Sequence, residues 1–142
     1  MSKIYMTLKM FYTAVYHSLP IDYVLVDSWF TCEALIRAVV GEGIHLIGMY
    51  KIAKAKFLYH GKNLTCSEIR NSISKITRCH SLNLYYKRAD VLYDGVRLTL
   101  FFSRQGKRGK WKTLLTTDTS LSFIKLMEHY HCRWMIEVFN YV

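Results

Sequence analysis

The sequence has few of the residues and patterns that mark several common protein classes. One proline and seven glycines in 142 residues exclude collagen-like chains and proline- or glycine-rich low-complexity chains. The four cysteines lie far apart and form no CxxC pair, which fits neither a zinc ribbon nor a small disulfide framework. No apolar run approaches the roughly 18–20 residues that a membrane span requires, and Lys9 interrupts the apolar N-terminal stretch. We therefore expect a cytoplasmic protein with no signal peptide and no membrane partner.

Acidic residues are also scarce, and this scarcity gives the chain its charge. There are 10 Asp and Glu against 20 Lys and Arg, so the formal net charge is +10. Hydrophobic residues make up 51% of the chain and aromatic residues 15%, which excludes a disordered tail. The length is that of about one domain. A packed, basic domain of this size indicates a polyanionic partner such as nucleic acid, although a basic domain without such a partner is an open alternative.

Residues 1–50 contain the pattern of a strand, a helix and a second strand. The run 23–26 is apolar and rich in β-forming residues, and it stops at Asp27. Residues 30–40 have apolar side chains at helical spacing and are followed by glycine. Residues 44–50 form a second apolar run. This order within about 30 residues predicts a βαβ unit with a parallel sheet.

Residues 51–117 have a different character, typical of antiparallel strands. We expect strands at 56–59, 82–86, 91–93, 96–102 and 111–116, and a short helix within 65–76. Asp94 and Gly95 predict a two-residue hairpin turn between two of these strands. The segment therefore resembles an antiparallel insertion with a small sheet of its own.

Residues 118–142 have a helical pattern, and Asp118, Thr119 or Ser120 can serve as the N-cap. Apolar and aromatic side chains form one stripe along this helix: Phe123, Met127, Tyr130, Trp134 and Val138. The chain as a whole is predicted to be of the α/β class, or α+β by content.

Two carboxylates, Asp27 and Glu137, interrupt otherwise apolar elements. A carboxylate in such a setting is costly unless it is paired, hydrogen-bonded or bound to a metal. The carboxyl end of a parallel strand is also where α/β sheets place their ligands. On the last helix, Tyr130, Arg133 and Glu137 project from one face, so they can reach a phosphate and a divalent cation. Alternatively, Asp27 caps the following helix and Arg133 forms a salt bridge with Glu137. A third acid, Asp118, is expected to be structural.

Two groups of basic residues could contact a phosphate backbone. They are Lys51, Lys54 and Lys56 in the first group, and Arg104, Lys107, Arg108 and Lys110 in a glycine-punctuated hairpin loop. Either group could instead be a solvated surface.

Three blocks of the sequence resemble DDE-type insertion-sequence transposases, in the group named after insertion sequence four. Residues 23–30, with Val-Asp-Ser-Trp-Phe, are similar to the block around the second catalytic aspartate of that family. Residues 114–122 resemble the segment that leads into its glutamate helix. Residues 130–139 are similar to its signature Tyr-x2-Arg-x3-Glu-x6-Lys, and the first three members match as Tyr130, Arg133 and Glu137. The resemblance extends over most of the chain.

This resemblance implies a fold, a chemistry and a set of partners. The fold would be a partial RNase H-like domain made of residues 1–50 and 118–142, with residues 51–117 as an inserted β subdomain. Asp27 and Glu137 would be two of three ligands for Mg²⁺ or Mn²⁺, which supports phosphoryl transfer in DNA transposition. Tyr130 and Arg133 would hold a DNA phosphate, and the insertion would add further contacts. The protein would be bacterial and nucleoid-associated, as a homo-oligomer or a mixed oligomer with intact transposase.

The sequence also departs from the family pattern. The signature lysine would fall beyond the last residue, and residues 1–22 contain no match for the first catalytic aspartate. We therefore expect a fragment truncated at both ends, which binds DNA and cleaves little or none of it alone. The alternative is a non-catalytic DNA-binding or interaction module, or an inhibitor, derived from a transposase.

Overall fold

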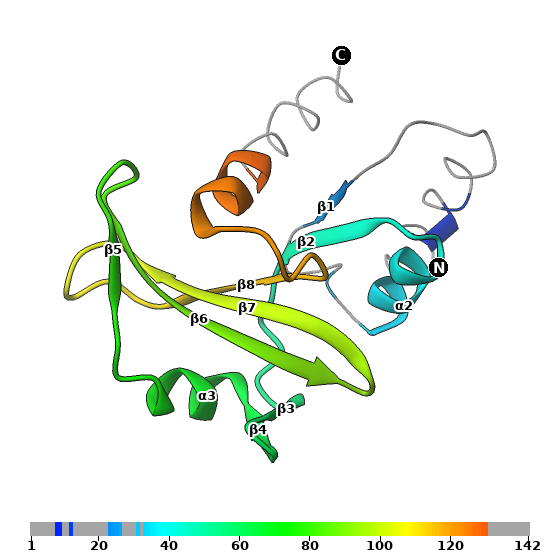
Figure 1. Cartoon of the computed structure of the whole chain (residues 1–142), viewed down its shortest axis with the longest axis horizontal. Coiled ribbons are helices and arrows are strands. Elements are labelled where there is room, and N and C mark those ends of the chain that lie inside the picture. Colours follow the sequence, from blue (N-terminus) through cyan, green and yellow to red (C-terminus); the bar gives the residue numbers. More distant parts are fainter. Residues whose placement is uncertain (1–7, 10–11, 13–22, 27–30, 32, 131–142) are drawn as a thin grey trace.

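The two apolar runs before residue 50 form parallel strands joined by a helix. β1 spans Tyr23–Val26, α2 spans Glu33–Gly41 and β2 spans His45–Met49, and β1 pairs with β2 in parallel. The protein is seen here as a computed structural model that describes residues 8–9, 12, 23–26, 31 and 33–130 (Figure 1). Within these residues the predicted βαβ unit is confirmed.

The remaining described residues add mostly strands, so the fold is mixed α/β with a predominance of sheet. The further elements are β3 (Lys56–Tyr59), β4 (Lys62–Thr65), α3 (Cys66–Ser72), β5 (Thr77–Cys79), β6 (Leu84–Tyr93), β7 (Val96–Arg104) and β8 (Lys112–Thr116). Residues 123–130 are helical. All strands in the described part of the chain belong to one eight-stranded sheet of order β1-β2-β8-β7-β6-β3-β4, with β5 paired to β6.

The strands of residues 51–117 do not form a sheet of their own, and this part of the prediction is wrong. β8 pairs antiparallel with β2, so that Ile47 lies opposite Thr116. Beyond the last paired residue, the backbone N–H of Tyr50 donates to the carbonyl of Thr113 at 2.9 Å. The antiparallel strands therefore continue the sheet that the parallel pair begins, and β2 is the strand that joins the two parts.

A single long hairpin forms the centre of the antiparallel part (Figure 1). The predicted turn at Asp94 and Gly95 is confirmed, and both residues have the positive φ angles, 49° and 84°, that such a turn needs. The prediction of two separate strands before this turn is wrong, because β6 is continuous over ten residues. Its polar middle, Lys87 to Asp90, pairs with the apolar strand β7.

Sequence reasoning missed the short strands β4 and β5. The turn between β3 and β4 consists of His60 and Gly61, with φ angles of 49° and 79°. This is again a two-residue hairpin turn, but its first residue is His rather than the Asn or Asp that usually marks one.

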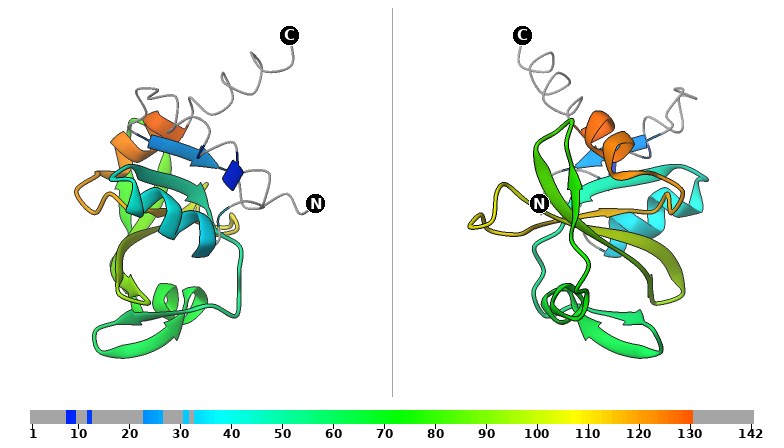
Figure 2. Two further views of the ribbon diagram at one scale, coloured as in Figure 1. Left: turned by 90° about the vertical axis from the view of Figure 1, so that its right-hand side faces the viewer. Right: turned by 60° about the vertical axis from the view of Figure 1, so that its left-hand side comes forward.

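Successive side chains on each strand enter opposite faces of the sheet, and each face is covered by helix. On β8, Leu115 packs in the core beneath α2 and α3, whereas Leu114 packs beneath residues 123–130. Figure 2 shows the helix of residues 123–130 and α3 on opposite sides of the sheet. Two hydrophobic cores thus share one sheet, and the elements that carry candidate site residues lie on both of its faces.

The N-terminus of α3 is closed by a reciprocal capping box. The Thr65 hydroxyl accepts from the Glu68 backbone N–H at 3.3 Å, and the Glu68 carboxylate accepts from the Thr65 backbone N–H at 3.1 Å. The predicted helix within 65–76 is therefore confirmed, although it ends at Ser72, after which Ile73 is extended.

We expect that removing this cap destabilises the protein measurably. Thr65→Ala leaves a backbone N–H of the first turn without its acceptor, which costs about 1 kcal/mol of unfolding free energy. Ser67→Ala, two residues further along on the exposed side of α3, serves as the control and should change stability little. The measurement is urea unfolding followed by circular dichroism. Equal midpoints for the two variants would contradict the role of the cap.

Candidate nucleic-acid interface

A cavity of about 410 Å³ lies where residues 123–130 pass over the end of the β7–β8 hairpin. Its wall combines the apolar residues Met49 and Met127 with Tyr130, and its rim carries basic side chains. The cationic lining residues are Arg104, Lys110 and Lys112. We call this hollow the Tyr130 cavity. It brings together two sequence-predicted groups, the start of the Tyr-x2-Arg-x3-Glu motif and the basic hairpin.

Tyr130 is held in this position by the packing of its helix on the sheet. Phe123, Leu126 and Tyr130 are buried, and the ring of Phe123 stacks on that of Tyr86 with 4.3 Å between centroids. Phe101 lies beneath them and is completely buried. The predicted helical stripe is thus confirmed for the residues up to Tyr130.

The N-cap of this helix is Ser122, not one of the three residues that the sequence suggested. The Ser122 hydroxyl accepts from the Lys125 backbone N–H at 3.2 Å. Asp118 instead accepts from the backbone N–H and the hydroxyl of Ser120, at 3.1 and 2.6 Å. The acid closes a turn before the helix, which leaves the capping position to a serine further along.

The basic hairpin loop keeps its shape through glycine. Gly106 has a φ of 71°, and a Cβ on Gly109 would lie 2.3 Å from the carbonyl oxygen of Gln105. The tight turn leaves Lys107, Arg108 and Lys110 exposed. Of these, only Lys110 lines the Tyr130 cavity, whereas Lys107 and Arg108 are absent from its wall.

The first predicted basic group, Lys51, Lys54 and Lys56, does not line the Tyr130 cavity. Lys51 lines a different hollow, between α3 and β8. Lys54 and Lys56 are exposed where the chain crosses from β2 to β3. The fold thus separates Lys51 from Lys54 and Lys56, which line neither of these two hollows.

Three of the predicted residues, Asp27, Arg133 and Glu137, lie outside the described residues. The described chain does fix where β1 ends, because Val26 pairs with Gly48. The next residue on β2, Met49, is already part of the wall of the Tyr130 cavity. Within the described residues, no group of three or more His, Cys, Asp or Glu side chains could hold a metal ion.

Asp118 lies at the other end of the same strands, and its role is structural as expected. Its carboxylate accepts from the hydroxyl of Tyr23, the first residue of β1, at 2.6 Å. The Tyr23 ring in turn stacks on His129 with 4.4 Å between centroids. Partial burial raises the pKa of Asp118, but the hydrogen bonds from Ser120 and Tyr23 and the charge of His45 outweigh it and leave this pKa below its usual value. β1 spans four residues, so its two ends are about 10 Å apart. Tyr23, held by Asp118, thus joins β1 to the helix of residues 123–130 at the end of β1 opposite the Tyr130 cavity.

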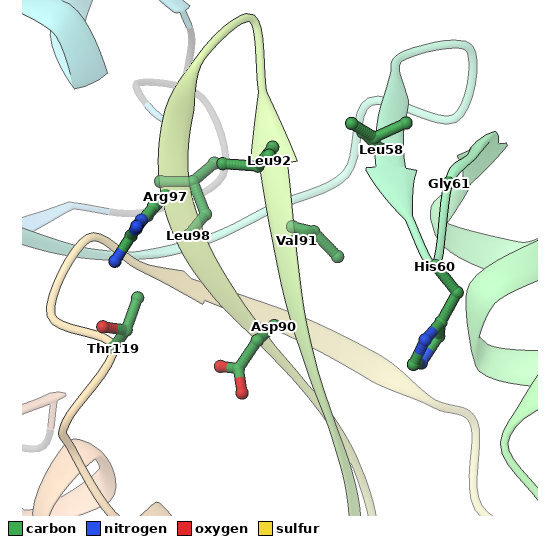
Figure 3. A pocket seen from close by; sticks show the side chains of 9 residues that line it. All are labelled: Leu58, His60, Gly61, Asp90, Val91, Leu92, Arg97, Leu98 and Thr119. Atoms are coloured by element: carbon green, nitrogen blue, oxygen red, sulfur yellow. The ribbon is translucent and has the colours of Figure 1, made fainter.

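A larger hollow, of about 460 Å³, lies near the β6–β7 turn and contains none of the sequence-predicted site residues (Figure 3). His60, Asp90 and Arg97 line it together with exposed leucines. The Asp90 carboxylate accepts from the Thr99 hydroxyl at 2.6 Å, so one of its oxygens is already engaged within the strand pair. This hollow mixes one carboxylate with two basic side chains and has no surplus of carboxylates for a metal.

No protein-family model matches the chain, and no curated protein matches it. In the part of the chain that the structure describes, no helix has both the length and the apolar character needed to cross a membrane.

Proposed function

We propose that this chain binds DNA through the Tyr130 cavity and the adjoining basic hairpin, as part of the catalytic domain of a DDE-type transposase. The proposal joins the resemblance of three sequence blocks to the clustering of Tyr130 with Arg104, Lys110 and Lys112 around one hollow. Under this proposal the domain has an RNase H-like fold, for which the parallel pair β1–β2 with α2 between them is the supporting feature.

The position of the cavity along the sheet is the observation that carries the proposal. β1 and β2 run in parallel, and the cavity begins at Met49, just past the point where Val26 ends β1. Asp27 follows Val26 in the sequence. Ligands of α/β sheets bind outside the carboxyl ends of parallel strands, so a DNA phosphate in the cavity would lie close to the end of β1.

The chemistry divides between the basic cavity and the two acids. A divalent cation held by Asp27 and Glu137 would activate the attacking oxygen and stabilise the leaving one. Arg104, Lys110 and Lys112 would neutralise phosphates, since positive charge dominates the affinity of proteins for DNA. Asp118 is no candidate for the family's first catalytic aspartate, because its carboxylate is already hydrogen-bonded to Tyr23 and Ser120. We therefore propose non-specific DNA binding with little or no cleavage.

The alternative, a non-catalytic DNA-binding or inhibitory module, uses the same cavity. It is favoured by the surplus of cations around the hollow. The two proposals differ in what a metal does. A transposase fragment retains weak metal affinity through Asp27 and Glu137, whereas a pure binding module gains nothing from Mg²⁺ or Mn²⁺.

DNA binding is tested by removing three positive charges from the hairpin. We expect the triple variant Lys107→Gln, Arg108→Gln, Lys110→Gln to bind duplex DNA more weakly. Its plot of log affinity against log salt should be shallower by up to about 2.7, or roughly 0.9 for each lost phosphate contact. The matched control removes the same charge from exposed positions elsewhere, Lys62→Gln, Lys75→Gln and Arg97→Gln. The measurement is fluorescence anisotropy of labelled duplex over a range of salt concentrations. Equal slopes for the two triple variants would contradict the proposed interface.

The catalytic part is tested with the same full chain and supercoiled plasmid. We expect little or no nicking with Mg²⁺ or Mn²⁺. Nicking that required the metal and disappeared in Glu137→Gln would overturn the expected inactivity and establish Glu137 as catalytic. Mn²⁺-dependent tightening of DNA binding that Asp27→Asn abolished would favour the transposase fragment over the pure binding module.

A further inference from the structure

A second basic hollow lies on the face of the sheet opposite the Tyr130 cavity. It has a volume of about 330 Å³ and lies between α3 and the start of β8. Its lining includes Lys51, Arg70, Trp111 and Lys112. We call it the α3 cavity. Met49 and Lys112 line both cavities, so the two hollows meet around the end of β2.

Two cations lie against the ring of Trp111, which forms one wall of the α3 cavity. The Arg104 guanidinium carbon lies 4.5 Å from the centroid of the Trp111 ring, and the Lys87 ammonium nitrogen lies 5.2 Å from it. The Lys87 ammonium also donates to the backbone carbonyl of Arg70 at 3.0 Å. This contact joins β6 to α3 and brings the positive charges of both elements to the same place.

These cations have no acidic partner among the described residues. The salt bridges there involve Arg37, Arg88 and Lys125, and none involves Arg70, Lys87 or Arg104. Loss of water around Lys87, together with the positive charges of Arg104 and Arg70, holds the pKa of Lys87 below its usual value. A group of cations that is partly desolvated and mutually repulsive is stabilised when an anion binds among them.

Two buried donors without acceptors also indicate an anionic ligand. The Nε atoms of Arg70 and Arg104 are buried and have no acceptor within the described structure. Buried donors without acceptors are rare in folded proteins, because each costs about 1–3 kcal/mol. Cys66, which also lines the cavity, adds no negative charge, because burial raises the pKa of its thiol to about 11.

We propose that the α3 cavity binds a phosphate group, with Arg70 and Lys51 as its direct contacts and with Arg104 and Lys87 supplying charge from behind Trp111. The phosphate would belong to a nucleic-acid strand that continues from the Tyr130 cavity around Lys112, or to a free phosphate ester. The first source rests on the proposed function, and the second does not. An arginine fork beside an aromatic wall is suited to both, since the fork matches phosphate oxygens and the ring packs against a sugar or base.

The test compares two arginine variants of the full chain. Arg70→Gln removes a cation that lines the cavity, whereas Arg78→Gln removes an exposed one that lies over Tyr85 and donates to Asn83. Both substitutions remove one charge. The two contacts made by the Arg70 backbone use its carbonyl oxygen and survive the change. Lys51→Gln, at an exposed position in the same cavity, gives a second variant if Arg70→Gln alters the fold by circular dichroism.

Two probes distinguish the two sources of phosphate. With a short fluorescein-labelled oligothymidylate, we expect Arg70→Gln to weaken binding about tenfold and to reduce the salt slope by about 0.7, and Arg78→Gln to change affinity less than about twofold. With inorganic phosphate, we expect a change in tryptophan fluorescence that is lost in Arg70→Gln and in Trp111→Phe. A response to phosphate without an effect on the oligonucleotide assigns the site to a free phosphate ester.

The proposal and the proposed function fail in different ways. If the chain binds no DNA, the proposed function fails, and the phosphate titration still decides on the α3 cavity. If the chain binds DNA but Arg70→Gln and Lys51→Gln behave like Arg78→Gln with both probes, the α3 cavity proposal is overturned and the Tyr130 cavity remains the interface.

Discussion

Phe101→Ala is expected to cost about 3–5 kcal/mol of unfolding free energy, the range for removing a fully buried aromatic side chain. Phe101 is completely inaccessible to solvent. Its ring lies 5.7 Å from that of Phe123 and 6.1 Å from that of Tyr86, measured between centroids. Phe101 therefore supports the packing of residues 123–130 on the sheet, and alanine would leave a cavity beneath that helix.

The consequence for function follows from the same packing. Because Tyr130 reaches its cavity through this helix, we expect Phe101→Ala to weaken DNA binding even at temperatures where the variant stays folded. Leu92→Ala is the control, since Leu92 lies on the neighbouring strand and is 36% exposed; it should change stability by no more than about 0.5 kcal/mol. Guanidinium chloride unfolding measures both. A loss of less than about 1 kcal/mol of unfolding free energy for Phe101→Ala would show that the helix does not depend on packing against Phe101.

Gly48→Ala is expected to destabilise the protein by up to about 3 kcal/mol, the upper part of the range for overpacking a core. A Cβ at this position would lie 2.3 Å from Oγ1 of Thr31 and 2.9 Å from a methyl carbon of Val26. Thr31 is 1% exposed and Val26 is 7% exposed, so neither side chain can move aside into solvent. The glycine lets the side chains of Val26 and Thr31 pack directly on β2, beside the strand end that the proposed function requires.

A matched glycine variant isolates the steric effect. A Cβ on Gly41, at the end of α2, would meet nothing within 4 Å, so Gly41→Ala should be neutral or stabilise by about 0.4–1 kcal/mol. The double variant Gly48→Ala, Thr31→Ala should be less destabilised than the sum of its two single changes, because the clashing atoms are gone. Thermal unfolding of the four variants measures this coupling. Additive losses would mean that Gly48 is required for a reason other than Thr31.

Local sequence patterns predicted those helices, strands and turns that depend mainly on their own residues. The apolar run of β1, the helical spacing in α2 and the turn at Asp94 and Gly95 are all readable within a few residues. The continuity of β6 could not be predicted in this way, because its polar middle interrupts the apolar pattern. In the structure, β7 pairs with each of these polar residues, Lys87 to Asp90. The pairing of β8 with β2 could not be predicted, since it depends on tertiary packing between distant segments.

The candidate site shows the same division between local and long-range information. Charge and glycine spacing identified the hairpin that carries Arg104 and Lys110, and the motif identified Tyr130. Nothing local indicated that these residues share one cavity, or that Lys51 belongs to another. Of the cations around Trp111, only Arg104 was among the predicted residues, and Lys87 was missed. The sequence signal that could have indicated this cluster is the mixture of aromatic and basic residues on β6, where Tyr85 and Lys87 lie on the same face.

The pairing of β2 with β8 has a consequence for how the chain reaches this structure. Ile47 and Thr116 lie opposite each other, so the whole β3–β7 segment must be brought round as a closed loop before these two strands meet. The entropy of loop closure opposes that step, whereas the β6–β7 hairpin closes across two residues and forms without it. Proteins dominated by such non-local pairings fold in milliseconds to seconds rather than microseconds. We therefore expect the hairpin to form before the junction, and Met49, which lines both the Tyr130 and the α3 cavity, to reach its position only when the slow step is complete.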